Sequence, residues 1–577
     1  MAKKLQRTTA QHITPFVSPE AQSELVDARR LPPERIRFAI TREEVEAVED
    51  GRREFTVIGQ PRALRALHLS AQVRSKGYNV FVTGLPGTGR RTAVTKVLEE
   101  YRNDLSRIKD VVYVFNFRHP ERPKALYFPP GKGVAFRDAL KSYVEQIGSL
   151  IEEQARDQGF KDHRDQKVVE VEGKENRALS DFEERLKADG FAVVRGEEND
   201  QADIAPIIDG TAYRFEELQE LLQQGKIDQD AWTDLRERYY RYVDEMSAIY
   251  HQMRSDRDRV ERELRSIRLE GLRPMLSERL EPIRREFPDP GVARHLDSML
   301  EDILEQIELF VPPEQDREDA PESPADRYAV NVFIDHSETT KAPLVIEVYP
   351  DAQTLFGSQD PGGDHSGESR PGHMGLRGGS VAAASGGFLV LRAEDVLTSE
   401  ELWHGLKRTI LEEKTEIRSA AHPLGPPPGA LKPDPISVDL KLVLLGNDQL
   451  YDYLFAQDEE FGKLFKVPAE FDSVMPRTDQ TTQEYIRFMR MVESDENLLP
   501  FTHDAIAGIL EYSVRLAELR DKLSTRFSHI ADIMRESTHW ARQRAASDVD
   551  REDVARAQEE RRFLYNMPEE KIDEQIL

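Results

Sequence analysis

The chain has 577 residues, 32% of them charged, and a net charge of −27. This length exceeds what one hydrophobic core usually organises, so we expect three or four domains. The negative field repels phosphate backbones and anionic lipids, which argues against nucleic acid or a membrane as the main partner. The absence of cysteine excludes disulfides and thiolate chemistry and fits the reducing cytoplasm. Neither a secretory signal nor a membrane-spanning apolar run is found.

The first part of the chain is interpreted as an arm followed by an α/β region. Residues 1–54 form an N-terminal adaptor arm ending in an acidic helix, where Thr41 and Glu44 have the spacing of a capping box. Residues 55–137 contain an amphipathic helix, then the buried strand YNVFVTG, a glycine turn, a helix and a second strand, VVYVFNF. This strand–helix–strand order predicts a parallel sheet.

Residues 138–326 are strongly charged and mostly helical. Apolar residues recur there at seven-residue intervals, as in the seam of a coiled coil: Trp232, Tyr239, Met246, Met253, Val260 and Ile267. Leu235, Tyr242 and Ile249 supply the second seam position, which then fails at Asp256 and Glu263. We interpret the segment as a coiled-coil-like hairpin with a small β piece; a long helix packed on its neighbours is an equal alternative. An acidic, proline-bearing linker closes the insertion.

The remainder of the chain returns to α/β and then becomes helical. Residues 327–480 hold four strand-like runs: YAVNVFID, PLVIEVYP, GGFLVLRA and DLKLVLLGN. Residues 481–577 have apolar residues at helical spacing and predict an all-α bundle. The predicted fold is therefore a parallel α/β sheet with flanking helices, split by a long helical insertion and followed by an all-α domain.

The glycine turn after the first strand carries the clearest chemical signal. It reads Gly84-Leu85-Pro86-Gly87-Thr88-Gly89-Arg90-Arg91-Thr92. A turn of this kind, between a strand and a helix, directs backbone N–H groups and the positive end of the helix at a phosphate. The spacing from Gly84 to Gly89 matches the phosphate-binding loop, in which Lys and then Ser or Thr follow.

The residues after the turn depart from that pattern. Arg90 and Arg91 stand where Lys and a hydroxyl are expected, and Thr92, the hydroxyl that would hold Mg²⁺ if ATP binds, comes one residue late. Arg is larger than Lys and planar, so the exchange changes the chemistry. Two interpretations stay open: a nucleotide site with altered chemistry, and a glycine turn kept for structure alone.

An ATP-hydrolysing site also needs an acid at a strand end to hold Mg²⁺ and orient water. The best candidate strand, GGFLVLRA, ends in Arg392, and Glu394 and Asp395 follow. They act as that acid only if the strand bulges. Otherwise they stabilise the start of the next helix.

Four further polar residues are candidates for sensing a nucleotide. Asn447 follows the strand DLKLVLLG and is either a γ-phosphate sensor or a turn residue. Arg526 is a candidate second sensor. Lys466 and Arg477 are candidate cations for the nucleotide of a neighbouring subunit. Lys466 and Arg477 are equally well ordinary surface charges, and for Arg526 a solvated helix charge is the favoured interpretation.

Long stretches of the sequence resemble the AAA+ portion of Lon-like ATP-dependent proteases of the B and C types, in which an insertion splits the ATPase domain. They occur in the order found in that family: IGQPRALRAL, GYNVFVTGLPGTGR, YVFNFRHPERPKAL, APLVIEVYPDAQTLFG, ASGGFLVLRAEDVL, VLLGNDQLYDYLFAQDEEFGKLFKVPAEF and IADIMREST. The resemblance implies an AAA+ P-loop domain, a helical insertion and an all-α lid.

The resemblance also implies a hexameric, cytoplasmic machine that uses ATP to handle unfolded or damaged proteins for degradation. In that family a C-terminal peptidase domain with a Ser-Lys dyad cleaves the client. No serine here has a Gly-Pro-Ser-Ala-Gly-like setting, so no catalytic peptidase residue is carried over, and a separately encoded Ser-Lys peptidase is an expected partner. One branch of the family has lost ATP dependence, which the altered turn resembles. The alternative is a non-catalytic hexameric scaffold that binds clients through its coiled-coil arm.

Overall fold

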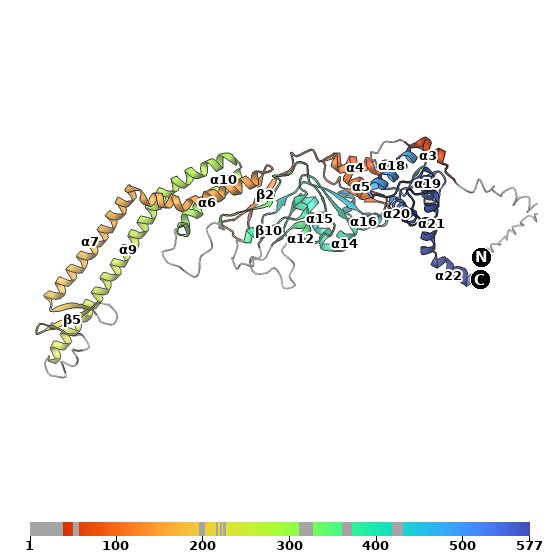
Figure 1. Ribbon diagram of the computed structural model, residues 1–577. Coiled ribbons are helices and arrows are strands. Elements are labelled where there is room, and N and C mark those ends of the chain that lie inside the picture. The colour runs from red at the N-terminus through yellow and green to blue at the C-terminus, as the bar shows by residue number, and fades with distance from the viewer. Residues whose placement is uncertain are drawn as a thin grey trace, which may run out of the picture.

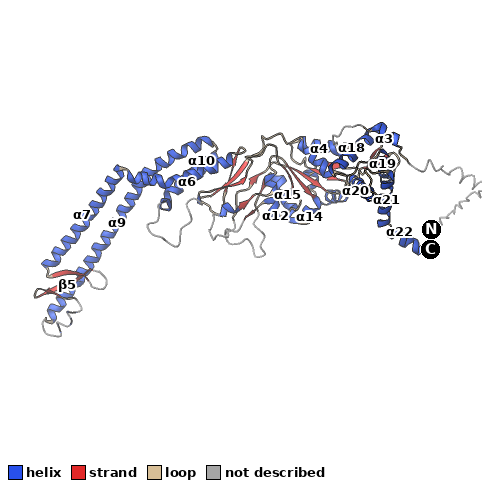
Figure 2. Cartoon of the chain, viewed as in Figure 1, coloured by secondary structure: helices blue, strands red, loops and turns tan. Residues whose placement is uncertain are grey.

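The computed structural model describes residues 39–49, 57–195, 202–214, 217, 219, 222, 227–310, 327–359, 372–417 and 431–576. The described chain is elongated (Figure 1). A central α/β core lies between a helical arm (residues 132–310) and a helical lid (residues 479–576). Strands are concentrated in the core, and a few lie at the far end of the arm (Figure 2).

Five short strands form a parallel sheet in the order β15–β1–β14–β11–β8. Their bounds are Val467–Glu470 (β15), Val80–Thr83 (β1), Lys441–Leu445 (β14), Phe388–Arg392 (β11) and Leu344–Ile346 (β8). Since all the pairings are parallel, the carboxyl ends of the strands meet at one edge of the sheet. The sheet and its helices confirm the predicted fold class.

Helices cover both faces of this sheet, as a parallel sheet requires. Val80 and Val82 point toward α4 (Pro61–Gln72) and α5 (Arg90–Glu99), whereas Phe81 packs on the opposite face. The other core helices are α12 (Ala352–Phe356), α13 (Ser380–Ala383), α14 (Ala393–Leu397), α15 (Glu400–Glu412), α16 (Asp448–Gln457) and α17 (Phe461–Leu464). Two small ladders join β9 (Ser358–Gln359) to β10 (Leu376–Arg377) and β12 (Lys414–Thr415) to β13 (Ile436–Ser437), and η2 spans Gly372–Gly375.

A second sheet is antiparallel, with the order β3–β2–β7. β2 spans Asp110–Val114, β3 Lys124–Phe128 and β7 Val330–Ile334. The expectation that VVYVFNF lies in the parallel sheet beside the first strand is therefore wrong, and YAVNVFID also belongs to the second sheet. The reason is that β14 and β15 occupy both edges of β1. The edge strand β15, which is short and contains Pro468, was not anticipated.

The arm is a helical hairpin built on the second sheet. α6 (Lys132–Arg156) and α7 (Gln158–Ala188) lead outward, α9 (Gln229–Glu286) returns, and α10 (Pro290–Glu305) and η1 (Ile307–Phe310) follow. α6, the end of α9 and α10 share one hydrophobic core with β2, β3 and β7. The small β piece lies at the far end as an antiparallel sheet of β4 (Phe191–Arg195), β5 (Ala202–Ile208) and β6 (Thr211–Ala212).

The apolar seam of the arm is restricted to its far end. There Tyr242 is buried with Phe182 and Phe191. Where the heptad pattern fails, charged pairs join α7 to α9: Lys167 Nζ lies 2.9 Å from Glu263, and Arg257 lies 2.6 Å from Glu175. The structure therefore contains the helical hairpin, whereas coiled-coil geometry stays a prediction. The predicted linker at 311–326 lies outside the described residues.

The lid contains five helices: α18 (Asp479–Asp495), α19 (His503–Ala517), α20 (Phe527–Gln543), α21 (Arg551–Tyr565) and α22 (Met567–Ile576). It also contains one short strand, β17 (Lys522–Ser524), which pairs with β16 (Val474–Pro476) and ties the lid to the core. From the N-terminal arm, α3 (Arg42–Val48) packs on the lid through the buried Val45. Its predicted capping box is confirmed: Thr41 Oγ accepts from the Glu44 N–H at 3.3 Å, and the Glu44 carboxylate accepts from the Thr41 N–H.

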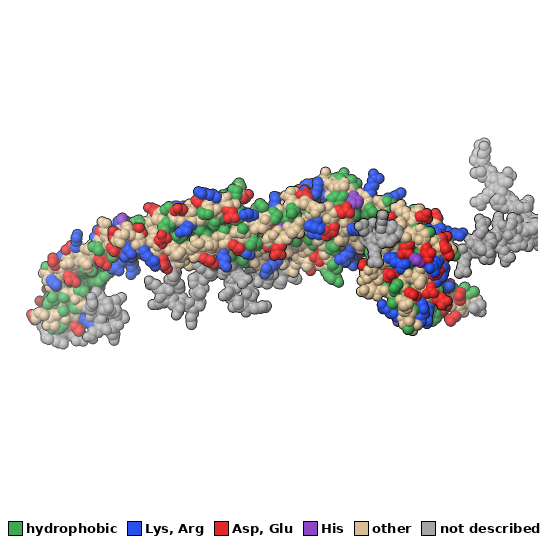
Figure 3. All heavy atoms as spheres, turned by 45° about the horizontal axis from the view of Figure 1, so that its top comes forward, with side chains coloured by type: hydrophobic (Ala, Val, Ile, Leu, Met, Phe, Trp, Pro, Cys, Tyr) green, Lys and Arg blue, Asp and Glu red, His purple; other side chains and the backbone are tan. Residues whose placement is uncertain are grey.

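The surface mixes charges of both signs. Figure 3 shows basic and acidic side chains interspersed along the whole visible face, with no long basic stripe on it. Within the described residues, no helix is both long and apolar enough to cross a membrane.

Candidate functional site

The glycine turn joins the carboxyl end of β1 to the amino end of α5, the context that a phosphate-binding loop needs. Gly84, Gly87 and Gly89 have φ values of 128°, 85° and 76°, a region that side chains with a Cβ rarely enter. Thr88 is buried, and its hydroxyl donates to the Leu85 carbonyl at 2.8 Å. The local sequence pattern therefore predicted both the place and the shape of this turn.

A pocket of about 430 Å³ opens beside the turn, at the carboxyl edge of the sheet. Among its lining residues are the predicted candidates Gly87, Gly89, Arg90, Arg91, Thr92 and Glu394. Gly84 and Thr88 shape the turn without lining the pocket. The ends of β8, β11 and β14 supply the remaining walls, which include Glu347 and Arg392.

Arg90 is bound by the protein itself. Its guanidinium donates a hydrogen bond to the Gly446 carbonyl, directly after β14. Burial lowers the pKa of Arg90, while the nearby carboxylates of Glu394 and Asp448 oppose that shift. The cation that stands in the place of the phosphate-binding Lys is thus engaged in a bond between α5 and the sheet.

The two acidic candidates lie in the first turn of α14 and differ in position. Glu394 lines the pocket, whereas Asp395 lies 3.6 Å from the guanidinium of Arg392. β11 pairs with β14 in unbroken register from Phe388 to Arg392, so no bulge moves these acids onto the strand end. Both stand where acids stabilise the start of a helix.

The candidate sensors lie outside the pocket lining. Asn447 is the N-cap of α16, and its side-chain oxygen accepts from the Leu450 N–H at 2.8 Å, which is the turn role. Arg526 precedes α20, the lid helix whose Ser528 N–H donates to the Gly87 carbonyl at 3.2 Å. The lid therefore touches the glycine turn directly, and Arg526 lies two residues from that contact.

The two candidate trans-acting cations have partners within the chain. Lys466 Nζ donates to the Lys76 carbonyl at 3.3 Å and lies 5.2 Å from the ring centroid of Tyr78, before β1 begins. This places Lys466 at the edge of the sheet opposite the glycine turn. Arg477 follows β16, and its N–H donates to the Asp521 carbonyl at 2.8 Å.

Two charged residues of the pocket, Glu347 and Arg392, were not predicted as site residues. Glu347 directly follows β8, and its carboxylate accepts from the N–H of Val348 at 3.0 Å and from the hydroxyl of Ser380 at 2.6 Å. Both stand at strand ends, so the rule that parallel strands end at one edge was the available signal.

Basic side chains outnumber acidic ones in the pocket lining. Three arginines (Arg90, Arg91, Arg392) face two carboxylates (Glu347, Glu394). The Glu347 carboxylate already accepts a hydrogen bond within its own loop. Thr92, the third residue of α5, is exposed to solvent. No group of three or more metal-binding side chains occurs in the part of the chain that the structure describes. Among the predicted residues, Glu394 supplies an acid and Thr92 a hydroxyl to the pocket lining, whereas Asp395 and Asn447 do not line it.

Comparisons with known proteins find three family models that match stretches of the chain. Residues 340–472 match the model of a LonB-like AAA domain, residues 500–563 that of an archaeal LonB AAA+ ATPase LID domain, and residues 110–142 that of a Lon-like LonC helical domain. No curated protein matches. Among solved structures, crystal structures of NtrX from Brucella abortus, one of them in complex with ATP, match with a TM-score of 0.26 and 14% identity. These matches cover 37% of this chain and 43% and 44% of the NtrX chains.

Proposed function

Because the chain belongs to the Lon-like AAA+ family, we propose that it is the ATPase-like module of a machine that handles unfolded or damaged proteins for degradation, with a degenerate nucleotide site. The observation that carries this proposal is the bond from Arg90 to the Gly446 carbonyl. A phosphate entering the turn has to compete with that bond, and the planar guanidinium does not reproduce the compact charge of Lys.

The contact between lid and turn supports the same conclusion. Ser528 N–H is bonded to Gly87, and the Thr525 hydroxyl donates to the carbonyl of Asp472, in the segment that leads from the core to the lid. These bonds hold the lid on the core through protein atoms alone. The lid therefore contacts the turn at Gly87, beside the position that a phosphate takes in a phosphate-binding loop.

An exposed aromatic residue at the sheet edge supports client handling. Tyr349 is 85% exposed on the loop after β8, two residues from Glu347, which lines the pocket. Large exposed aromatic side chains commonly anchor protein partners. We propose that Tyr349 contacts unfolded polypeptide, and that the chain works as a cytoplasmic homo-oligomer of six copies with a separately encoded Ser-Lys peptidase.

Isothermal titration and an ATPase assay test the nucleotide part of the proposal. For the unchanged chain with ATP and Mg²⁺ we expect a Kd above about 1 mM and very slow turnover. The repaired variant Arg90→Lys/Arg91→Thr is expected to bind at least about tenfold more tightly, a gain of about 1.4 kcal/mol. Arg62→Lys/Arg65→Thr, two exposed positions on α4, is the matched control and should leave binding unchanged. Micromolar ATP binding with rapid turnover by the unchanged chain would overturn the degenerate site.

A binding assay with a permanently unfolded, fluorescently labelled protein tests the client part. Tyr349→Ala is expected to weaken binding at least about threefold, which corresponds to about 0.6 kcal/mol. The matched variant Tyr240→Ala removes a tyrosine that is 55% exposed on the arm. Loss in the arm variant and not in Tyr349→Ala would favour a scaffold that binds clients through its arm.

A further inference from the structure

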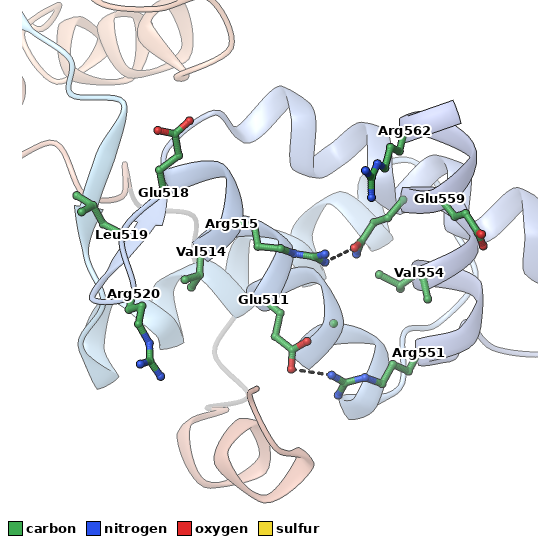
Figure 4. Close-up of a pocket in the computed structure, with 13 residues that line it drawn as sticks. Glu511, Val514, Arg515, Glu518, Leu519, Arg520, Arg551, Val554, Glu559 and Arg562 are labelled. Atoms are coloured by element: carbon green, nitrogen blue, oxygen red, sulfur yellow. Dashed lines mark hydrogen bonds and ion pairs between the residues drawn. The ribbon is translucent and has the colours of Figure 1, made fainter. Parts of the chain in front are cut away.

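A groove on the lid lies apart from the glycine turn. It has a volume of about 770 Å³ and runs between α19 and α21 (Figure 4). Val514 and Val554 give it an apolar floor, while arginine side chains from both helices line its sides. A groove with an apolar floor and a charged rim fits an amphipathic helix.

Four arginines (Arg515, Arg520, Arg551, Arg562) and three glutamates (Glu511, Glu518, Glu559) line the groove, so its basic side chains outnumber its acidic ones by one. Arg551 lies 2.6 Å from the Glu511 carboxylate. Arg515 donates instead to the uncharged side-chain oxygen of Gln558. Arg562 makes no ion pair with any carboxylate of the described residues. Two cations of the groove, Arg515 and Arg562, therefore remain available for an acidic ligand.

The last helix of the described chain has the complementary character. α22 has no buried residue and leads away from the rest of the lid (Figure 1). Met567, Ile572 and Ile576 are 62%, 57% and 76% exposed. Its acidic residues are Glu569, Glu570, Asp573 and Glu574. A ten-residue helix without a partner is marginal in water, so this helix gains most by binding a surface.

We propose that α22 of one copy docks in the groove between α19 and α21 of a second copy. The apolar residues Ile572 and Ile576 would lie on Val514 and Val554, and the acidic residues would face Arg515 and Arg562. Because the two surfaces of this contact differ, each copy offers one groove and one helix. Such head-to-tail contacts generate a closed ring when the rotation between copies closes. The contact involves neither the glycine turn nor Tyr349, so its failure would leave the nucleotide and client parts of the proposed function standing; it rests on the proposed function only for assembly of several copies.

Sedimentation of mixtures of variants tests the head-to-tail arrangement. The unchanged chain is expected to assemble beyond the single-chain mass of 66.1 kDa. The tail variant Ile572→Asp/Ile576→Asp and the groove variant Arg515→Glu/Arg562→Glu should each sediment as single chains. When mixed, the tail variant still has an intact groove and the groove variant an intact helix, so pairs of twice the single-chain mass should form and grow no further.

A charge exchange and a matched control complete the test. Adding Glu569→Arg/Glu570→Arg to the groove variant should restore assembly. The helix is then basic and the groove acidic, so the two surfaces attract each other again. Lys109→Glu/Lys141→Glu makes the same change of charge at exposed positions outside the lid and should assemble like the unchanged chain. Circular dichroism checks that each variant folds. A single-chain mass for the unchanged protein, or undiminished assembly of the tail or groove variant, would overturn the proposal.

Discussion

At the scale of single residues, the buried side chain of Lys441 makes the stability of the folded chain depend on pH. It begins β14, is 7% exposed, and its Nζ donates to the carbonyls of Ser75 and Tyr78 at 3.4 and 3.3 Å. Burial lowers the pKa of Lys441 to about 8, from its usual 10.5. Between these pH values the unfolded chain holds a proton that the folded chain has released, so stability from this group rises with pH.

We therefore predict that the Lys441→Met variant lacks this increase of stability with pH. Relative to the variant, the unchanged chain should gain about 2 kcal/mol of unfolding free energy between pH 8 and pH 10. Urea denaturation of both proteins at several pH values measures the difference. Parallel pH profiles would contradict the assignment of the lowered pKa to Lys441.

Some features of the candidate site could be predicted from the local sequence, and others could not. The turn through Gly84, Gly87 and Gly89 was predicted in the right place because glycine spacing alone specifies such a turn, and the binding of a nucleotide there stays a prediction. The bond from Arg90 to Gly446 was not foreseen, because its two ends are 356 positions apart and meet only when β1 and β14 pair. Glu347 directly follows β8, so the rule that parallel strands end at one edge could have indicated it.

At the scale of elements, one buried carboxylate fastens the arm to the core. Asp302 of α10 is 7% exposed and accepts two hydrogen bonds from the Arg327 guanidinium, at 2.8 and 2.9 Å. It also accepts from the Tyr328 hydroxyl at 2.7 Å, and Tyr328 lies just before β7. Removing one partner of a buried pair leaves the other without compensation, which costs about 3 kcal/mol or more.

Asp302→Ala is accordingly expected to speed amide hydrogen exchange of α10 and β7 by about a hundredfold, the equivalent of about 3 kcal/mol. Glu301→Ala is the matched control one residue away. It removes an ion pair with Arg273 whose side chains are 52% and 57% exposed, and such pairs contribute less than about 1 kcal/mol. Equal exchange in the two variants would show that Asp302 does not fasten the arm.

In the middle of the arm, beyond the end of the apolar seam, charged pairs hold α7 and α9 together. The Glu175 side chain is 8% exposed, and both its oxygens accept from Arg257, at 2.6 and 2.7 Å. Arg257→Ala is predicted to leave this carboxylate buried without its cation and to open α7 and α9 locally. Limited proteolysis should then cut the arm at least about tenfold faster than in Arg156→Ala, which removes a pair exposed to solvent. Equal cleavage rates would assign the Arg257 pair no structural role.

Elements were predicted better than their pairings. The strands VVYV and VNVFI exist where buried runs of β-branched residues indicated them. Their placement in a separate antiparallel sheet was not predictable from chain order, because it is decided by α6 and α10, which cover that sheet from within the insertion. The hairpin arm followed from helical periodicity, which is local, whereas the docking of α3 on the lid joins segments more than 400 residues apart.

At the scale of the whole molecule, acid-sensitive groups gather where arm and core meet. Among the described residues the buried histidines are His295, His336 and His373, and none of them lies in the lid. His295 of α10 stacks on Phe117 with ring centroids 5.6 Å apart. Burial, with smaller effects from Lys124 and His373, lowers the pKa of His295 to about 3.

Mild acid is therefore expected to loosen the arm base before the lid. Below pH 6.5 the unfolded histidine binds a proton that folded His295 excludes, so this stability is complete above pH 6.5 and is lost progressively toward pH 3. At pH 5 the loss amounts to about 2 kcal/mol, which should speed amide exchange in α10 about thirtyfold relative to pH 7 after correction for intrinsic rates, while α19 stays protected. His295→Gln, which does not titrate, should abolish most of that difference. If α10 and α19 open together as the pH falls, acid acts on the molecule as a whole, and His295 is not the group that makes the junction sensitive.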